Sequence, residues 1–484
     1  MQSGDLVRVR RGLYFKVPGP TRYGPVKPRV EEVAREVFRA PNSGFGPAGY
    51  SAARILGLTT QVPAKFEASA LRKADPPVPG VVLHVRSNPA RAALNEQEIA
   101  VLEVLRSPEH FVDGGMTTLA RKVNDLATAS SATARPRQGG SRRNRTGEGE
   151  PRTVDRCAQV SGVTRRPVTP RLRDNLDDLD ALLGQAADAL NRPFAFLEKD
   201  FWAMEVLRVA ARDRPIALRD GTTGTVRTVF KGGTSLSRVY GLIDRFSEDI
   251  DLLVIFPDEG GGSSENQRDK LLKVIQAEVH QYLGADAVCE ELLRSTRGVK
   301  RDIKYHYPLR EAVYTALSEG VTLEMGARGG AEPAEQHILR SIIADYAITE
   351  LGESDNQWEE FATFDVNVLK AERTLLEKLA AVHTITSDAT AAAPAGWGRH
   401  LHDIYWLLES EAVRAKLAAL GPEGRDQLVG DIEQRSAAAD WPSAAASRGI
   451  RVEPGIRSRR TMCSESGRGL RGRHGFDVRP GSPD

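Results

Sequence analysis

Two short segments near the middle of this chain constrain its fold more than any other feature. The first reads Lys-Gly-Gly-Thr-Ser-Leu at residues 231–236, and the second reads Asp-Ile-Asp at residues 249–251. The β-branched and aromatic residues at 226–230 and 250–256 predict a strand before the glycines and a strand that carries the acidic pair. Because side chains alternate along a strand, Asp249 and Asp251 are expected on the same face of the sheet.

The acidic pair favours a metal site. Two convergent carboxylates suit Mg²⁺, or Mn²⁺, because these ions prefer hard oxygen ligands that include substrate phosphates. Such an ion can orient a nucleoside triphosphate and stabilise charge during in-line displacement. An acidic pair by itself is more often simply solvated, so this interpretation depends on the glycine turn beside it.

The glycine turn favours phosphate binding. Glycines let the backbone approach a phosphate closely, and a helix that starts there adds free N–H groups and a favourable dipole. The candidate phosphate ligands are Lys231, Gly232, Gly233, Thr234, Ser235 and Arg245. An ordinary role in a turn or at the surface is the alternative for each of them. A Walker A loop is excluded, because the pattern Gly-x4-Gly-Lys-Ser/Thr is absent.

The order strand, glycine turn, helix and Asp-x-Asp strand resembles the polymerase-beta-type nucleotidyltransferase superfamily. More narrowly, the string KGGTSLSRVYGLIDRFSEDIDL resembles the signature of the AbiEii/AbiGii toxin family. Residues 198–202, 373–379 and 399–405 are similar to further motifs of that family in the same order. The resemblance implies an α+β fold, in which a polymerase-beta-type nucleotidyltransferase domain is followed by C-terminal helices.

Three residues outside the central motifs are further candidates. By the resemblance, Lys378 would contact the triphosphate and Asp403 would be a catalytic or site-organising carboxylate. Glu324 lies in an apolar stretch that predicts a strand, and it is a candidate third carboxylate and general base for the attacking hydroxyl. Many superfamily members have an aspartate in such a strand. A solvated lysine and a structural aspartate are the alternatives for Lys378 and Asp403.

The first 127 residues have a resemblance of their own. Residues 6–17 predict two strands joined by a turn at Arg11-Gly12. Segments at residues 10–14, 46–52 and 57–63 are similar to AbiEi-type antitoxins, which implies a smaller mixed α/β domain that binds operator DNA. Arg8, Arg10 and Arg11 would then contact DNA phosphates. The recognition helix expected before this hairpin is missing, and one basic hairpin does not by itself specify a DNA sequence.

Two basic segments separate and follow the globular regions. Residues 129–172 contain ten Lys or Arg against three acidic residues, and the tail from residue 443 contains nine Arg. Such segments cannot bury enough apolar surface to offset their ordering entropy, so we expect them to be disordered. The expected organisation is an antitoxin-like domain at 1–127, a linker at 128–173, a transferase domain at 174–440 and a tail at 441–484. A frameshift that joined two neighbouring genes is an alternative origin of these segments.

The remaining composition indicates a cytoplasmic protein. The three cysteines are too scattered for a disulfide framework or a zinc cluster. No signal peptide and no apolar stretch of about 18 residues is present, so no membrane partner is expected.

These features predict a toxin of a type IV toxin–antitoxin system, a class associated with abortive infection and phage defence. It would transfer a nucleoside monophosphate from an NTP to an acceptor hydroxyl, and the resemblance suggests the tRNA 3′ end as acceptor, which would block translation. One alternative is a catalytically silent toxin–antitoxin fusion that acts as a DNA-binding regulator. Another is a nucleotidyltransferase with a protein or small-molecule acceptor.

Overall fold

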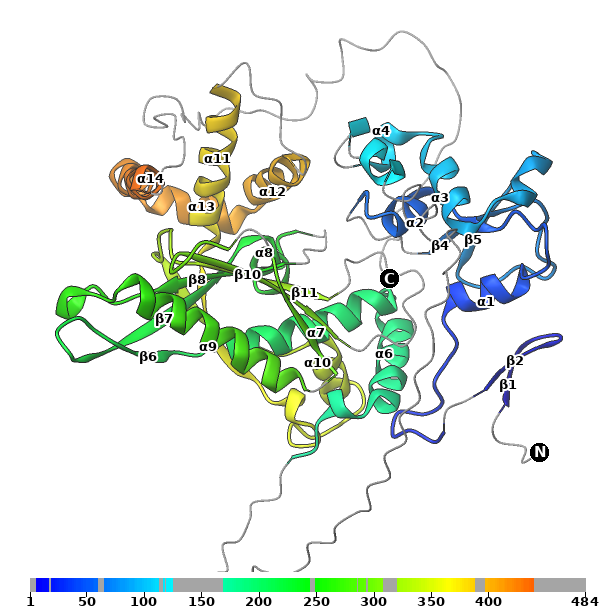
Figure 1. Ribbon diagram of the computed structural model, residues 1–484, viewed down its shortest axis with the longest axis horizontal. Coiled ribbons are helices and arrows are strands. Elements are labelled where there is room, and N and C mark those ends of the chain that lie inside the picture. The colour runs from blue at the N-terminus through cyan, green and yellow to red at the C-terminus, as the bar shows by residue number, and fades with distance from the viewer. Residues whose placement is uncertain are drawn as a thin grey trace, which may run out of the picture.

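The chain folds into two regions, shown in Figure 1, a computed structural model. It describes residues 6–16, 19–59, 65–112, 116–117, 119–124, 169–243, 249–284, 286–292, 295–307, 320–387 and 397–438. The first region ends at residue 124 and the second begins at residue 169. We call the second region the transferase region, after the domain expected there. Within the described ranges, no helix combines the length and the apolar composition needed to cross a membrane.

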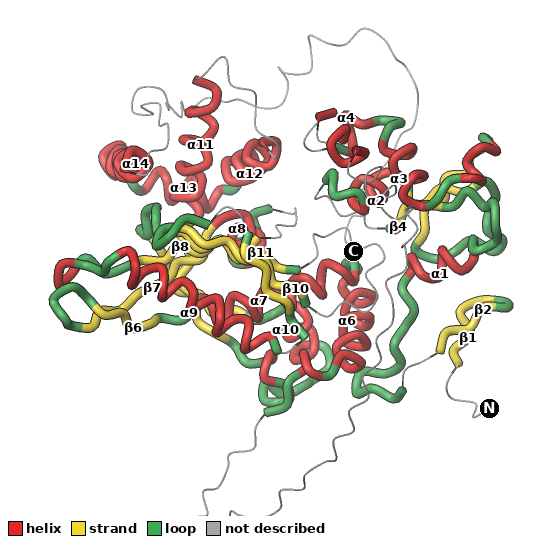
Figure 2. The backbone as a smooth tube through the Cα atoms, in the orientation of Figure 1, coloured by secondary structure: helices red, strands yellow, loops and turns green. Residues whose placement is uncertain are grey.

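A mixed sheet of eight strands is the centre of the transferase region (Figure 2). The strands run in the order β12-β13-β7-β8-β11-β10-β9, and β6 pairs with β7 beside this path. Neighbours are antiparallel except for the parallel pairs β8/β11 and β13/β7. The bounds are β6 Arg214–Ala217, β7 Thr223–Lys231, β8 Asp249–Ile255, β9 Val288–Glu291, β10 Lys300–His306, β11 Val321–Gly326, β12 Ala334–Leu339 and β13 Phe364–Leu369.

Helices cover both faces of this sheet (Figures 1 and 2). One layer contains α6 (Leu176–Leu190), α7 (Phe194–Ala210), α9 (Glu265–Leu283) and α10 (Ile342–Thr349). The other contains α8 (Gly232–Arg238), α11 (Ala371–Ser387), α12 (Trp397–Glu409), α13 (Glu411–Ala419) and α14 (Gly421–Ala438). We call these the α7 layer and the α11 layer.

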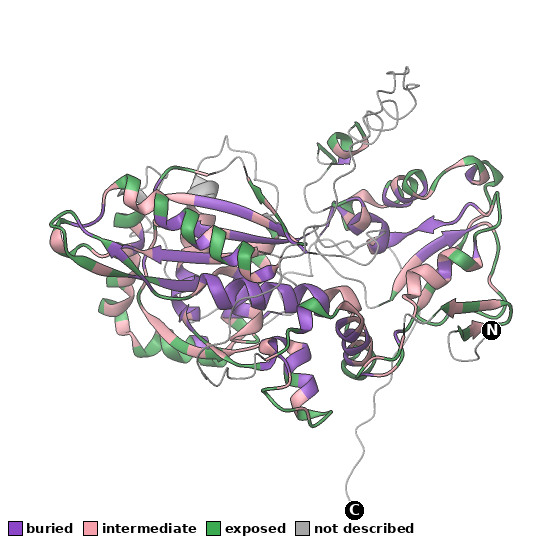
Figure 3. Ribbon diagram, turned by 60° about the horizontal axis from the view of Figure 1, so that its bottom comes forward, coloured by how far each residue is buried: buried purple, intermediate pink, exposed green. Residues whose placement is uncertain are grey.

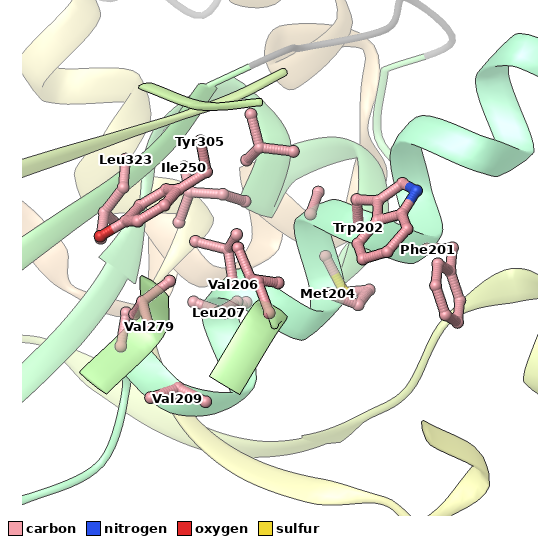
Figure 4. Packing of buried hydrophobic residues seen from close by; sticks show 14 of the residues in the cluster. Phe201, Trp202, Met204, Val206, Leu207, Val209, Ile250, Val279, Tyr305 and Leu323 are labelled. Atoms are coloured by element: carbon pink, nitrogen blue, oxygen red, sulfur yellow. The ribbon is translucent and has the colours of Figure 1, made fainter. Parts of the chain in front are cut away.

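The main core lies between the sheet and α7. Every residue of α7 from Leu197 to Ala210 is buried, so this helix has no solvent-facing stripe (Figure 3). Phe201 and Leu207 belong to the same apolar cluster as Ile250 of β8 (Figure 4). Burial of large side chains of this kind contributes roughly 1.5–3 kcal/mol each, which makes α7 the principal packing element of the region.

A second, smaller core holds the α11 layer together. It joins Leu236 of α8 to Leu375 of α11, Ile404 and Leu407 of α12 and Val413 of α13. These residues come from parts of the chain that are far apart in sequence. Their packing brings the C-terminal helices over the start of α8.

The N-terminal region is built from smaller pieces. The hairpin of β1 (Leu6–Arg10) and β2 (Leu13–Lys16) is separate from a three-stranded sheet in the order β3-β4-β5. The elements of that sheet and its helices are β3 Gly46–Pro47, β4 Phe66–Ala70, β5 Val81–Val85, α1 Val30–Val37, α2 Gly49–Ile55, α3 Glu96–Val104 and α4 Pro108–Phe111. The predicted hairpin with its turn at Arg11-Gly12 is confirmed.

The transferase region starts earlier than the sequence predicts. Residues 169–173 were assigned to the disordered linker, yet Leu172 and Arg173 are buried. Arg173 forms an ion pair of 2.7 Å with Glu360, and the same carboxylate accepts the N–H of Leu172. The basic composition of this segment predicts disorder, but one of its charges, that of Arg173, has a specific buried partner. The rest of the predicted linker and the tail after residue 438 lie outside the described residues.

Candidate active site

The predicted acidic pair lies at the start of β8, in the middle of the sheet. Asp251 is in register with Glu324 of the parallel strand β11, and Glu324 is in register with Asp302 of β10. Residues directly opposite each other on paired strands share a face of the sheet. Ile250 belongs to the core under α7, so these carboxylates face the α11 layer.

Gly232 and Asp251 approach each other so closely that only glycine fits. Gly232 has φ of +81°, in the left-handed region that side chains disfavour. A Cβ added there would lie 1.9 Å from Oδ2 of Asp251. The absence of a side chain therefore lets the backbone of the turn lie against the carboxylate.

Burial and mutual repulsion oppose ionisation of these carboxylates. Burial raises the pKa of Asp251 to about 7, Lys231 and Lys378 lower it, and Glu324 and Asp249 raise it further. Burial also raises the pKa of Glu324, against the effect of Lys300. These groups influence one another through space, so the fold has brought them into a single site.

Two hydroxyls of the glycine turn have structural partners. Thr234 donates its hydroxyl to the carbonyl oxygen of Asp249 at 2.5 Å, which ties α8 to β8. Ser235 donates to the carbonyl oxygen of Gly232 at 2.9 Å. Their hydroxyl protons therefore point to backbone carbonyls, and the backbone of the turn is the part left to meet a phosphate.

Lys378 and Asp403 meet at the site from two different helices. Lys378 of α11 lies with Nζ 3.0 Å from Oδ2 of Asp403, which is fully buried on α12. Lys231, at the end of β7, is 3.8 Å from Glu377. Lys378 therefore has a specific carboxylate partner in Asp403, and it is not the merely solvated lysine that was the alternative.

A network around Arg373 holds α11 in place. Its guanidinium is buried and contacts Glu377 on the same helix at 3.1 Å and Asp431 of α14 at 2.6 Å. It also donates to the carbonyl oxygen of Glu332. The position of Lys378, five residues further along, therefore depends on contacts with α14 and with the loop before β12.

The charged motif at the start of α7 contains Asp200, whose carboxylate has a structural role. Its carboxylate forms an ion pair of 2.6 Å with Arg238, at the end of α8, and accepts the N–H of Ile342 at 2.8 Å. The site helix α8 is therefore held at its far end by a buried carboxylate from the opposite layer.

Sequence reasoning missed two residues beside Glu324. Lys300 Nζ lies 2.9 Å from Oδ2 of Asp302 and 3.4 Å from Oε2 of Glu324. Asp302 is fully buried. The alternation Lys-x-Asp was the available signal, since in a strand it places both side chains on one face, as in the Asp-x-Asp pair.

His402 and Trp406 extend the site towards the surface. Trp406 donates its indole N–H to Nε2 of His402 at 3.1 Å, and Nδ1 of His402 is 3.5 Å from Oδ1 of Asp403. Because Nε2 accepts, the neutral ring carries its proton on Nδ1, facing the carboxylate. His402 was noticed only as part of a resembling motif.

The other predicted residues are placed differently. Arg8, Arg10 and Arg11 belong to the β1–β2 hairpin, where Arg10 donates to the carbonyl oxygen of Asp75 at 3.0 Å. Arg245 lies outside the described residues. Among the residues that the structure describes, no three His, Cys, Asp or Glu side chains form a group that could hold a metal by themselves.

Part of the chain matches a known protein family. Residues 222–440, less than half of the chain, match the family model described as nucleotidyl transferase AbiEii toxin, type IV TA system. A solved structure, the nucleotidyltransferase toxin MenT4 from Mycobacterium tuberculosis H37Rv, is similar over 52% of this chain and 97% of its own, with 15% identity and a TM-score of 0.28. That likeness is too weak to add to the family match. No curated protein matches the chain. The matched range contains the glycine turn, the acidic strand, Lys378 and Asp403, and residues 222–440 are a nucleotidyltransferase domain of the AbiEii toxin family.

Proposed function

We propose that this domain transfers a nucleoside monophosphate from an NTP to the 3′-terminal hydroxyl of tRNA. The observation that carries the proposal is the register of Asp251 with Glu324, with Asp249 on the same face and Gly232 against the Asp251 carboxylate. The acceptor is suggested by the family resemblance and the chemistry by the carboxylates. A modified 3′ end could not be aminoacylated, and translation would stop.

The carboxylates fit a divalent cation. Asp249 and Asp251 offer hard oxygen donors, and a cation between them would offset the burial and the mutual repulsion that raise the pKa of Asp251. When bound, Mg²⁺ or Mn²⁺ would supply charge neutralisation for the triphosphate. Since the protein contributes so few ligands here, phosphate oxygens and water would complete the coordination.

The remaining residues have roles in binding and proton transfer. In this proposal the triphosphate lies against the backbone of the Gly232–Gly233 turn, and Lys231 and Lys378 neutralise its charge. Glu324 accepts the proton of the acceptor hydroxyl, a role that its raised pKa favours. The acceptor oxygen forms a bond to the α-phosphorus, the bond from that phosphorus to the bridging oxygen breaks, and pyrophosphate leaves. Asp403 holds Lys378 in place.

The test uses the full chain with Mg²⁺, bulk tRNA and each α-³²P-labelled NTP in turn. We expect label on tRNA with at least one NTP, and no label when Asp249 and Asp251 are both replaced by Ala. A matched control is Asp258→Asn, because Asp258 follows the same strand outside the site. Label on protein or on a small molecule would replace the tRNA acceptor, and absence of label with every NTP and acceptor would favour the silent fusion.

A further inference from the structure

Residues 20–29, between β2 and α1, lie on the transferase region although they precede it by more than a hundred residues. We call this segment the strap. Figure 1 shows it as the dark-blue chain that runs beside α6. Tyr23 and Val26 are each only 6% exposed and belong to the main core cluster of the transferase region. The strap is therefore part of a core that lies almost entirely in another region.

The first half of the strap has directional contacts. Trp358 donates its indole N–H to the hydroxyl of Tyr23 at 2.7 Å, in a buried position. Arg22 binds both carboxylate oxygens of Glu353, at 2.6 and 2.8 Å. The backbone N–H of Arg22 donates to Asp178 of α6 at 2.6 Å. Bidentate arginine–carboxylate pairs are geometrically specific, so these contacts fix the register of the strap.

The second half adds charge complementarity. The guanidinium of Arg29 lies 4.7 Å from the centre of the Phe194 ring, at the start of α7, and 3.9 Å from Asp180. Lys27 pairs with Asp188, but both side chains are more than half exposed. The basic strap thus lies along an acidic face of α6, and the exposed Lys27 pair is expected to contribute little.

The strap leaves the candidate active site open. It packs on the α7 layer, whereas the carboxylates face the α11 layer. Contact with the strap therefore does not cover the residues proposed for catalysis. An association of this kind joins the two regions without blocking the transferase.

We propose that the strap is a docking peptide, and that it holds the N-terminal region on the transferase domain without any need for the covalent connection between them. The transferase side of this interface is an acidic and aromatic surface formed by α6, the start of α7 and residues 353–358. Its occupant is the strap of the same chain, a basic segment with a buried tyrosine and valine.

The test is cleavage of the full chain at a protease site inserted between residues 128 and 160. We expect the two fragments to remain associated in size-exclusion chromatography and analytical ultracentrifugation as the protein is diluted. Separation of the wild-type fragments, with each still folded by circular dichroism, would overturn the proposal. This readout is binding, so it is independent of whether the transferase acts on tRNA.

Charge-reversal variants test whether the strap is what holds the two fragments together. Glu353→Arg should weaken fragment association about tenfold, because it replaces the attraction to the half-exposed Arg22 with a repulsion. Adding Arg22→Glu should restore most of the association, because the pair is re-formed with opposite signs. Trp358→Phe should also weaken association, because it removes the indole N–H that donates to Tyr23 but keeps an aromatic ring at this position. Lys27→Ala is the matched control and should change nothing. If cleaved Glu353→Arg and Trp358→Phe both stay as tightly associated as wild type, another surface joins the regions and the proposal is wrong.

Discussion

Charged side chains are arranged differently on the two faces of the sheet in the transferase region. On the α7 side, Arg208 and Glu205 of α7 form a buried ion pair at 3.1 Å, and Arg173 and Glu360 form another at 2.7 Å beside that layer. On the face towards the α11 layer, Asp251 and Glu324 lie in register as neighbours of the same sign. The sheet is shared, so the difference comes from the side chains on its two faces.

This difference separates charges that stabilise the fold from charges that are available to bind a ligand. Charges that are satisfied within the protein stabilise one arrangement and have little left to offer a ligand. Like charges that share a partly buried site are costly in the free protein and are relieved when a cation and a phosphate bind. We therefore expect substitutions in the α7 layer to change stability and substitutions in the site to change activity.

The largest effect is expected for Asp200→Ala, which breaks the ion pair between the buried Asp200 of α7 and Arg238 of α8. Loss of one partner of such a pair typically costs about 3–5 kcal/mol, and Arg238 and the N–H of Ile342 would lose their acceptor. Urea denaturation followed by circular dichroism measures the change. The exposed pair of Arg340 and Asp345 provides the control Asp345→Ala, with an expected cost below about 1 kcal/mol. Equal costs for the two variants would contradict the structural role assigned to the buried carboxylate of Asp200.

Next comes Gly232→Ala, which acts on the site. The added Cβ would meet the Asp251 carboxylate, so either the turn or the carboxylate must move. We expect a loss of transfer activity of about 100-fold or more, against a stability cost of only about 1 kcal/mol from the positive φ. Gly241→Ala is the matched control, since Gly241 also has positive φ but a Cβ there would meet nothing within 4 Å. Comparable activity losses in both variants would contradict the role of the close approach.

A smaller, pH-dependent effect is expected for Glu198→Gln in α7. Burial raises the pKa of Glu198 to about 7, Arg29 lowers it and Asp180 raises it. The raised pKa means that the folded state binds the proton more tightly than the unfolded state, so stability falls as pH rises from about 4.5 to about 7. The Gln variant should lack this decline and be more stable than wild type at pH 8, by up to about 3 kcal/mol.

Urea denaturation at pH 5 and pH 8 measures this effect. The exposed Glu423→Gln in α14 is the control and should follow the wild-type profile. A Glu198→Gln variant that loses stability between pH 5 and pH 8 as steeply as wild type would show that Glu198 is not the group responsible.

The smallest effect is expected for His402→Ala. His402 touches Asp403 and is itself held by Trp406, so it positions the carboxylate and does not contact the α-phosphate in our proposal. We expect kcat to fall up to about tenfold, the cost of about 1.4 kcal/mol, with KM for the NTP unchanged. Trp406→Phe should give a smaller fall in the same direction. Leu401→Ala, exposed on the same helix, should have no effect, and a changed KM in His402→Ala would indicate direct contact with the nucleotide.

The sequence by itself determined the parts of this protein that depend on near neighbours in the chain. Alternation along β8 places Asp249 and Asp251 on one face, and the glycines next to a strand end predict the turn that Gly232 makes. The hairpin at Arg11-Gly12 follows from the same local rules. The resemblance added Lys378 and Asp403 as members of the site, but not their contact.

Only the tertiary structure decided which distant residues meet. Lys378 and Asp403 come together because the small core around Leu236 packs α11 and α12 on α8. Lys300 and Asp302 join the site through the order of β8, β11 and β10, which no local pattern encodes. The sequence of the strap is that of an ordinary basic loop. Its docking depends on an acidic surface that forms only when α6 and residues 353–358 lie side by side in the fold. Local propensity acts over a few residues, whereas burial selects partners across the whole chain.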